Sequence, residues 1–170
     1  YYMNGGVGYA EELLGNYDFL AFVMGDQTWA SDMPSSGSAT YNGFAQMLVS
    51  EQVTNWYDEI LYERNKWYLN GTSTFTADFA TRNFTGQLDF EYLAYANSPH
   101  MLLQTIEGDD FILNLDGTIS GTSFSGTVTN PKTDPNDDVT SSFTGNFFGP
   151  NATELGGTFN YSNVNYTRDD

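Results

Sequence analysis

The sequence predicts an all-β protein, a single eight-stranded antiparallel up-and-down β-barrel with one short helical excursion. Three observations lead to this fold class. Apolar and polar residues alternate over short stretches, turn-forming residues such as Gly, Asn and Asp separate those stretches, and an aromatic residue followed two positions later by Gly recurs. Such patterns are typical of antiparallel sheets. A chain of 170 residues has the length of one domain.

Residues 71–92 show the alternation most clearly. Polar side chains share one face from Thr72 to Asp78, while Phe75, Ala77 and Phe79 share the other. After a turn near Thr81-Arg82, the same pattern runs from Phe84 to Tyr92. Two runs of period two joined by a short turn predict a β-hairpin with one solvated face.

The aromatic-x-Gly repeat predicts how the sheet curls. It occurs as Tyr41-Asn42-Gly43, Phe84-Thr85-Gly86, Phe124-Ser125-Gly126 and Phe143-Thr144-Gly145. Residues two apart in a strand lie on the same face, so the rings can fill a narrow interior where Gly relieves crowding. We expect a common interior that contains Phe75, Phe79, Phe84, Leu88, Phe90, Phe124, Phe143 and Phe159.

The eight expected strands follow from these patterns and from the turn residues between them. They are Tyr17–Gly25, Ser38–Ser50, Gly71–Ala80, Asn83–Tyr92, Phe111–Leu115, Ser120–Thr129, Val139–Phe148 and Gly157–Tyr166. Residues 1–16 form an N-terminal extension, 17–166 the barrel domain and 167–170 a tail. Eight strands are the usual number for a small closed barrel.

One segment, residues 51–70, departs from the β pattern and is interpreted as an inserted aromatic segment. Apolar and aromatic residues between Glu51 and Tyr68 recur at steps of three and four, which predicts a short amphipathic helix. The stripe they form is either the packing face of that helix or a contact surface for a ligand or partner.

Composition excludes several classes of function. The chain has 22 acidic and 5 basic side chains, a net charge of −17, so it cannot neutralise the phosphates of a nucleic acid. The acidic balance is either a solvated surface or a negative face that steers a basic partner. With no cysteine there is no disulfide, thiolate metal site or cysteine nucleophile. No apolar run is long enough for a membrane-spanning helix.

No catalytic constellation is found, and the sequence predicts a protein that is not an enzyme. His100 is the single histidine, and neither a G-x-S-x-G turn nor a phosphate-binding Gly loop with its Lys occurs. The spacing of Asp134, Asn136 and Asp138 begins like a calcium loop but lacks the later Gly and Glu, so we interpret it as a solvated turn. His100, close to Tyr95 and Met101, is either a loop residue or an axial haem ligand. We therefore expect no cofactor, with haem as the alternative.

The C-terminal stretch resembles a known family motif. Phe143 to Phe159 is similar to the G-x-F-F/Y-G-P-x-A-x-E-x-G-G-x-F run in the β-barrel domain of transferrin-binding protein B and related Gram-negative surface lipoproteins and haemophores. The matching residues are Gly145, Phe147, Phe148, Gly149, Pro150, Ala152, Glu154, Gly156, Gly157 and Phe159. Weaker similarity in Met33–Gly43, Thr76–Gly86 and Ser120–Val128 extends the resemblance over about 17–161.

The resemblance implies the barrel fold more strongly than a particular ligand, because the motif marks the barrel and not a ligand site. It implies a non-enzymatic exported binding protein at the cell surface, associated with the outer membrane, or alternatively in the periplasm. Iron or haem acquisition, or another protein–protein interaction, is the expected role. The alternative is a structural or assembly subunit that uses the barrel as a scaffold in a larger complex.

A partner is expected to bind on connections between strands, because the barrel wall satisfies its own hydrogen bonds. The longest connections are Glu51–Asn70 and Leu93–Asp110. Aromatic residues are enriched at interfaces, and Met101 and His100 accompany them here. The candidate contact residues are Trp56, Tyr57, Tyr62, Trp67, Tyr68, Tyr95 and Met101, with His100 as the possible haem ligand.

Overall fold

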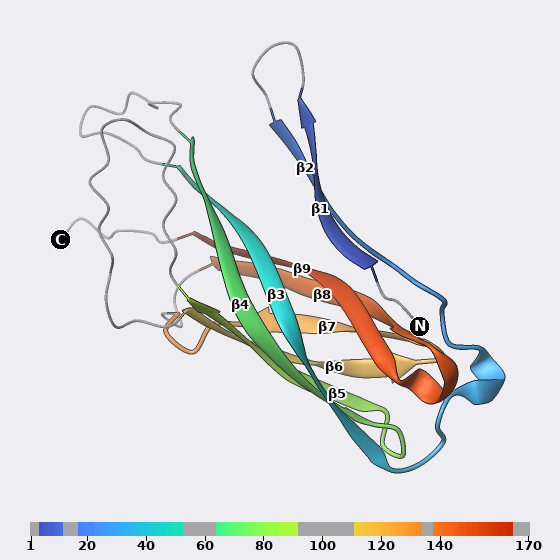
Figure 1. The fold of residues 1–170 in the computed structure, drawn as a ribbon. Helices are drawn as coiled ribbons and strands as arrows, with labels where there is room; N and C mark the ends of the chain where they lie inside the picture. Colours follow the sequence, from blue (N-terminus) through green and yellow to red (C-terminus); the bar gives the residue numbers. More distant parts are fainter. Residues whose placement is uncertain (1–3, 12–16, 53–63, 92–110, 134–137, 165–170) are drawn as a thin grey trace, which may run out of the picture.

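A computed structural model describes the backbone of residues 4–11, 17–52, 64–91, 111–133 and 138–164, and the side chains of 21–49, 69–90, 111–133 and 139–162. This part of the chain is built from β-strands and two short 3-10 helices (Figure 1). None of its helices has the length and apolar character needed to cross a membrane. The elements are β1 (Asn4–Glu11), β2 (Tyr17–Met24), η1 (Ala30–Asp32), β3 (Ser38–Gln52), β4 (Arg64–Asp78), β5 (Asn83–Glu91), β6 (Phe111–Ser120), β7 (Ser123–Thr129), β8 (Asp138–Phe148), η2 (Pro150–Ala152) and β9 (Glu154–Val164).

The strands form two antiparallel sheets. A seven-stranded sheet has the order β3-β4-β5-β6-β7-β8-β9, in which each strand pairs with its neighbours in sequence, and β1 pairs only with β2. The large sheet curls so that β3 returns toward the beginning of β9 (Figure 1). There the hydroxyl of Tyr41 in β3 donates a hydrogen bond of 2.6 Å to the carbonyl oxygen of Ala152 in η2. The predicted antiparallel up-and-down barrel is confirmed.

All eight expected strands are present, and two details differ from the prediction. The strand expected first, β2, contacts β9 but pairs with β1 instead of extending the large sheet. β1 lies within the expected N-terminal extension and was not predicted. Gly5, Gly6 and Gly8 explain the omission, because Gly is a poor strand former and obscures the alternation.

The prediction of a helix between Glu51 and Tyr68 is wrong for the two parts of this segment that the structure describes, 51–52 and 64–68. Glu51 and Gln52 continue β3, and Arg64 to Tyr68 begin β4. Gln52 lies opposite Arg64 in a ladder that continues without interruption to Ser38 and Asp78. Long-range pairing with the neighbouring strand therefore prevails over the local helical spacing of the aromatic residues. Residues 53–63 lie outside the described part.

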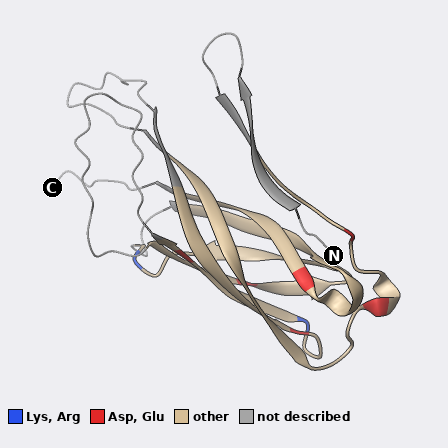
Figure 2. Cartoon of the chain, in the orientation of Figure 1, with Lys and Arg blue, Asp and Glu red and all other residues tan. Residues whose placement is uncertain are grey.

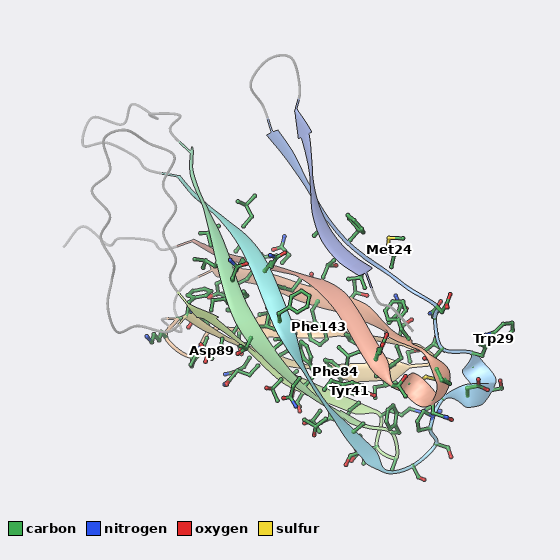
Figure 3. All side chains as sticks on the ribbon, viewed as in Figure 1. Met24, Trp29, Tyr41, Phe84, Asp89 and Phe143 are labelled. Atoms are coloured by element: carbon green, nitrogen blue, oxygen red, sulfur yellow. The ribbon has the colours of Figure 1, made fainter. Side chains whose placement is uncertain are left out.

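The predicted interior is confirmed. All eight residues expected to face inward belong to the core or pack against it, with Phe84 and Phe90 fully buried. Phe84 and Phe124 stack with ring centroids 4.2 Å apart and planes inclined by 7°. Phe143 and Phe147 surround this pair, at 5.6 Å from Phe84 and 5.3 Å from Phe124 respectively. The centre of the sheet is thus filled by stacked and tilted aromatic rings (Figure 3).

Each repeat glycine in the middle of the sheet lies opposite an aromatic residue of the adjacent strand. Gly86 pairs with Phe75, and a Cβ atom there would lie 2.2 Å from Cδ1 of that ring. Gly145 pairs with Phe124 in the same way, with a hypothetical Cβ 2.2 Å from Cζ. Gly126 pairs with Phe143. The rings therefore lie over the glycines of neighbouring strands, an arrangement for which we use the name ring-over-glycine packing.

The two ends of the sheet differ in their connections. At one end, which we call the short-turn end, lie the short links β4–β5, β6–β7 and β8–β9, together with η1 and η2 (Figure 1). The turn after β4 is capped by Asp78, whose Oδ1 accepts hydrogen bonds from the backbone N–H groups of Ala80 and Thr81 at 2.9 and 3.0 Å. Arg82 closes it with a left-handed backbone (φ 58°). The links β3–β4, β5–β6 and β7–β8 leave from the opposite end, which we call the long-connection end.

Candidate partner-binding surfaces

The interior of the sheet is built for packing. Its polar groups are satisfied, since no described buried side-chain nitrogen or oxygen is without a hydrogen-bond partner. Phe79, Phe147 and Tyr41 continue the aromatic cluster toward the short-turn end, with centroid distances of 5.7 Å between the first two and 6.1 Å between the last two. Phe90, Phe111 and Phe159 continue it toward the other end. A partner is therefore expected to contact the outside of the barrel.

The long-connection end holds the strand termini from which both predicted binding segments depart. Gln52 and Arg64 are paired at the ends of β3 and β4, and Phe90 is paired with Phe111 near the ends of β5 and β6. β4 and β5 are neighbours, but Glu91 at the end of β5 pairs with Asn70, six residues after the start of β4 at Arg64. The β3–β4 pair therefore extends beyond β5, and the two connections leave the same end of the sheet at different heights.

The candidate contact residues fall into two groups. Trp67 and Tyr68 belong to the backbone of β4, opposite Val49 and Leu48, and their side chains lie outside the described part. The other predicted site residues lie entirely outside the described residues; they are Trp56, Tyr57, Tyr62, Tyr95, His100 and Met101.

The described side chains form no cluster of metal-ligating residues. Among these, no group of three or more His, Asp or Glu residues could hold a metal ion. The predicted haem ligand His100 and the acidic turn at 134–137 are outside this part of the chain.

The C-terminal motif residues shape the link between β8 and β9. Gly149 adopts φ 71° and ψ 175°, a conformation that residues with a Cβ rarely take. Pro150 then begins η2, and Asn151 and Ala152 continue with positive φ. Ala152 is buried, and its carbonyl oxygen receives the hydrogen bond from Tyr41. The motif therefore fastens the β8–β9 link to the far edge of the sheet.

The remaining motif residues pack the last two strands together. Gly145 and Gly157 are paired across β8 and β9, and a Cβ on Gly157 would lie 2.5 Å from the carbonyl oxygen of Thr144. Phe147 is fully buried, and Gly156 is also buried. Glu154 begins β9 and pairs with Phe148 across the link. These roles agree with the interpretation of the motif as structural.

Among the residues whose side chains are described, the outer wall of the sheet is polar and carries few charges (Figure 2). Amide and hydroxyl side chains pair across strands, as in the hydrogen bonds from Gln46 to Asn70 and from Gln87 to Asn114, of 3.0 and 3.2 Å. Phe44 interrupts this wall on β3, with 77% of its surface exposed.

A further exposed group, which the sequence reading missed, lies between β2 and β3 at the short-turn end. Trp29 is 78% exposed and Met24 is 56% exposed, and both side chains project away from the barrel (Figure 3). The only sequence signal is a Trp between Asp26 and Asp32 in a stretch without alternation. Exposed apolar residues such as these are recognised from their accessibility in the structure and not from periodicity in the sequence.

Comparison with known proteins identifies the fold and the family. A family model described as the C-lobe and N-lobe beta barrels of Tf-binding protein B matches residues 33–168. Transferrin-binding protein B of Haemophilus influenzae (strain 86-028NP) is 31% identical over 168 residues, which cover 85% of this chain and 25% of that protein. The chain thus spans about a quarter of this curated relative.

Solved structures agree on the fold. Intact Ap-TbpB, with its N and C lobes, has a TM-score of 0.57 at 21% identity, over 93% of this chain and 30% of that one. A surface lipoprotein has a TM-score of 0.59 at 19% identity, over 94% of this chain and 70% of that one. With the sequence motif, the curled antiparallel sheet and the family match in agreement, the chain belongs to the family of transferrin-binding protein B β-barrel domains.

Proposed function

We propose that this chain is a non-enzymatic binding domain that acts at the surface of a Gram-negative bacterium and captures an iron-carrier protein of the transferrin type. The family and the name of the curated relative support the partner class. The chain would supply one barrel of a surface receptor and bind its partner through protein–protein contacts.

The filled interior is the observation that carries this proposal. Small-molecule carriers built on eight-stranded barrels hold the ligand inside. Here Phe84, Phe124 and Phe143 occupy the middle of the sheet, and Gly86 and Gly145 are covered by rings. Binding on the outside favours a macromolecular partner over an enclosed small ligand.

We place the contact with the carrier on the connections 51–70 and 93–110. Both belong to the same end of the sheet, with 64–70 as the first part of β4, and together they carry two of the three tryptophans and four of the twelve tyrosines. Trp and Tyr are the residue types that dominate binding energy at interfaces. The polar wall, whose side chains bond to one another across strands, offers fewer such anchors.

Binding to immobilised iron-loaded and iron-free transferrin, measured by biolayer interferometry, tests this proposal. Trp56→Ala and Trp67→Ala should each weaken binding by about 2 kcal/mol or more where the residue is a hot spot, which is roughly 30-fold in Kd. Phe44→Ala is the matched control, because it removes an exposed ring from the barrel wall. Binding that no tryptophan substitution affects would reject the location, and absence of binding would reject transferrin as the partner.

An assembly role is the second candidate, supported by the two open edges of the large sheet. Among the described residues, the paired neighbour of β3 is β4 alone and that of β9 is β8 alone, although β2 also contacts β9. Unpaired edges are templates for another chain. Light scattering coupled to gel filtration distinguishes the roles. A monomer that binds transferrin supports the receptor role, whereas a large assembly without carrier binding supports the scaffold role.

Haem remains an alternative ligand through His100. A haem titration followed by absorption spectroscopy tests it, with His100→Ala as the variant. This alternative predicts a Soret shift at one equivalent that the substitution removes, with unchanged far-UV circular dichroism. If no shift occurs in the unsubstituted chain, the haem alternative is rejected.

A further inference from the structure

The segment between β2 and β3 presents a group of exposed residues at the short-turn end, which we call the Trp29 corner: Asp26, Trp29 and Asp32. Met24, the last residue of β2, precedes it. Trp29 exposes 78% of its surface and Met24 exposes 56%, whereas most large apolar side chains of the large sheet are buried. The corner precedes the region matched by the family model, which begins at residue 33. The match to the family model therefore does not include these residues.

The backbone on the N-terminal side of Trp29 is fixed to the barrel. The N–H of Thr28 donates to the carbonyl oxygen of Phe147 at 3.0 Å, and its buried hydroxyl donates to the carbonyl oxygen of Gly149 at 2.7 Å. In return, the N–H of Gly149 donates to the carbonyl oxygen of Asp26 at 2.9 Å. Gln27 adds side-chain hydrogen bonds to Thr122 and Asn146.

The C-terminal side is closed by a tight turn. The N–H of Asp32 donates to the carbonyl oxygen of Trp29 at 2.9 Å, and the hydroxyl of Ser31 donates to the Asp32 carboxylate at 2.9 Å. An exposed indole on a fixed backbone loses little conformational entropy when a partner binds to it. The sheet thus presents Trp29 as a preorganised anchor.

The charge of the corner is uniformly negative. Asp26 and Asp32 flank Trp29 and are exposed, and no Lys or Arg occurs in the sequence before Arg64. Asp32 ends η1, and Figure 2 shows acidic positions but no basic one on η1 and the link before it. The chain as a whole carries a net charge of −17, which accelerates the approach of a cationic partner.

We propose that the Trp29 corner is a docking surface for an arginine-bearing segment of a protein partner. A guanidinium stacks on the face of an indole, the best of the aromatic rings for a cation, and its fork of N–H donors pairs with carboxylates. In this arrangement one arginine of the segment lies on Trp29, with Asp26 and Asp32 as the flanking carboxylates. The corner lies at the end opposite to the connections 51–70 and 93–110, so the inference stands independently of the proposed function.

Fluorescence anisotropy with the full chain and a labelled Gly-Arg-Gly-Arg-Gly peptide tests the proposal. Trp29→Ala should weaken peptide binding at least 10-fold, while Phe44→Ala, which removes an equally exposed ring, should change it less than about two-fold. Asp26→Asn with Asp32→Asn should weaken binding, whereas Asp89→Asn with Asp116→Asn should not, although both double variants change the net charge equally. Replacing Arg by Lys in the peptide should also reduce affinity.

Each other outcome overturns the proposal. If the two double carboxylate variants weaken binding equally, the peptide is attracted by net charge and not by the corner. If Trp29→Ala has no effect, the indole is not the anchor. If the unsubstituted chain shows no saturable binding up to about 1 mM peptide, which corresponds to a binding free energy of about −4 kcal/mol, there is no such site. Far-UV circular dichroism of Trp29→Ala should be unchanged, because the side chain is exposed.

Discussion

Gly86 offers the sharpest test of ring-over-glycine packing. An alanine at this position would place its Cβ 2.2 Å from Cδ1 and 2.9 Å from Cε1 of Phe75, and 3.1 Å from the carbonyl oxygen of Thr74. Carbon atoms in contact ordinarily lie about 3.5–4.0 Å apart, so the ring would have to move by roughly 1.3 Å. Phe75 also stacks on Phe84, with centroids 5.6 Å apart, and that contact would be disturbed as well.

The expected cost is the difference between two effects. Overpacking of this kind destabilises the folded state by about 1–3 kcal/mol. Replacing Gly by Ala in a strand offsets about 0.5–1 kcal/mol of this, because alanine lowers the conformational entropy of the unfolded chain. Gly86→Ala should therefore lower the free energy of unfolding by about 1–2 kcal/mol. If Phe75→Ala is introduced first, the obstructing Cδ1 and Cε1 atoms are gone and only the 3.1 Å approach to the carbonyl oxygen of Thr74 remains. Gly86→Ala should then cost about 1 kcal/mol less than it does beside the ring.

A double-mutant cycle isolates this coupling, because the unfolded-state contribution of Gly86→Ala cancels in it. Urea unfolding followed by circular dichroism supplies the four free energies. Phe159→Ala is the matched control: it removes another half-buried core ring, and with Gly86→Ala it should be additive within about 0.5 kcal/mol. Equal costs of Gly86→Ala with and without the Phe75 ring would refute ring-over-glycine packing at this site.

Three further expectations concern stability. Phe124→Ala, at the centre of the ring cluster, should lower the free energy of unfolding by about 3–5 kcal/mol. Thr127→Ala, on the outer face of the same strand, should change it by no more than about 0.5 kcal/mol. Similar urea midpoints for the two variants would contradict the buried position of Phe124. Burial raises the pKa of Tyr41 from 10.0 to about 12, so its neutral form is favoured in the folded state and stability should fall as pH rises through that interval. Tyr41→Phe should remove this slope in urea titrations, and a slope that persists would assign it to another group. Hydrogen bonds from the backbone and hydroxyl of Thr81 hold the pKa of Asp78 below its ordinary 3.8, so its contribution is present above that pH and is lost as pH falls through the lowered pKa. Asp78→Asn should flatten the acid limb of a pH–stability curve, and an unchanged limb would contradict the role of this cap.

The sequence predicts the faces of the sheet well, because alternation is a local property. Phe84, Phe124 and Phe143 are placed in the interior by their spacing alone, and the structure confirms them. What it does not predict is which glycine each ring covers. The partner of Phe124 is Gly145 and not the nearby Gly126, because this pairing depends on strand register, which is set by long-range hydrogen bonds.

Two elements show where local patterns mislead. Trp67 and Tyr68 fit a helical stripe by spacing but lie in β4, where pairing with β3 determines the conformation. In β1, three glycines hide a strand that β2 stabilises. Trp29 was missed for a different reason: its significance lies in exposure on a fixed backbone, which no periodicity reports.

Hydrogen–deuterium exchange of the chain with and without saturating iron-loaded transferrin tests the central claim most directly, because it reports binding and its location together. The account predicts slower exchange in 51–70 and 93–110, with unchanged exchange in the wall strands β6 to β8. Protection confined to those wall strands would contradict the assigned surface. Exchange that is the same throughout the chain in both samples would contradict capture of this carrier.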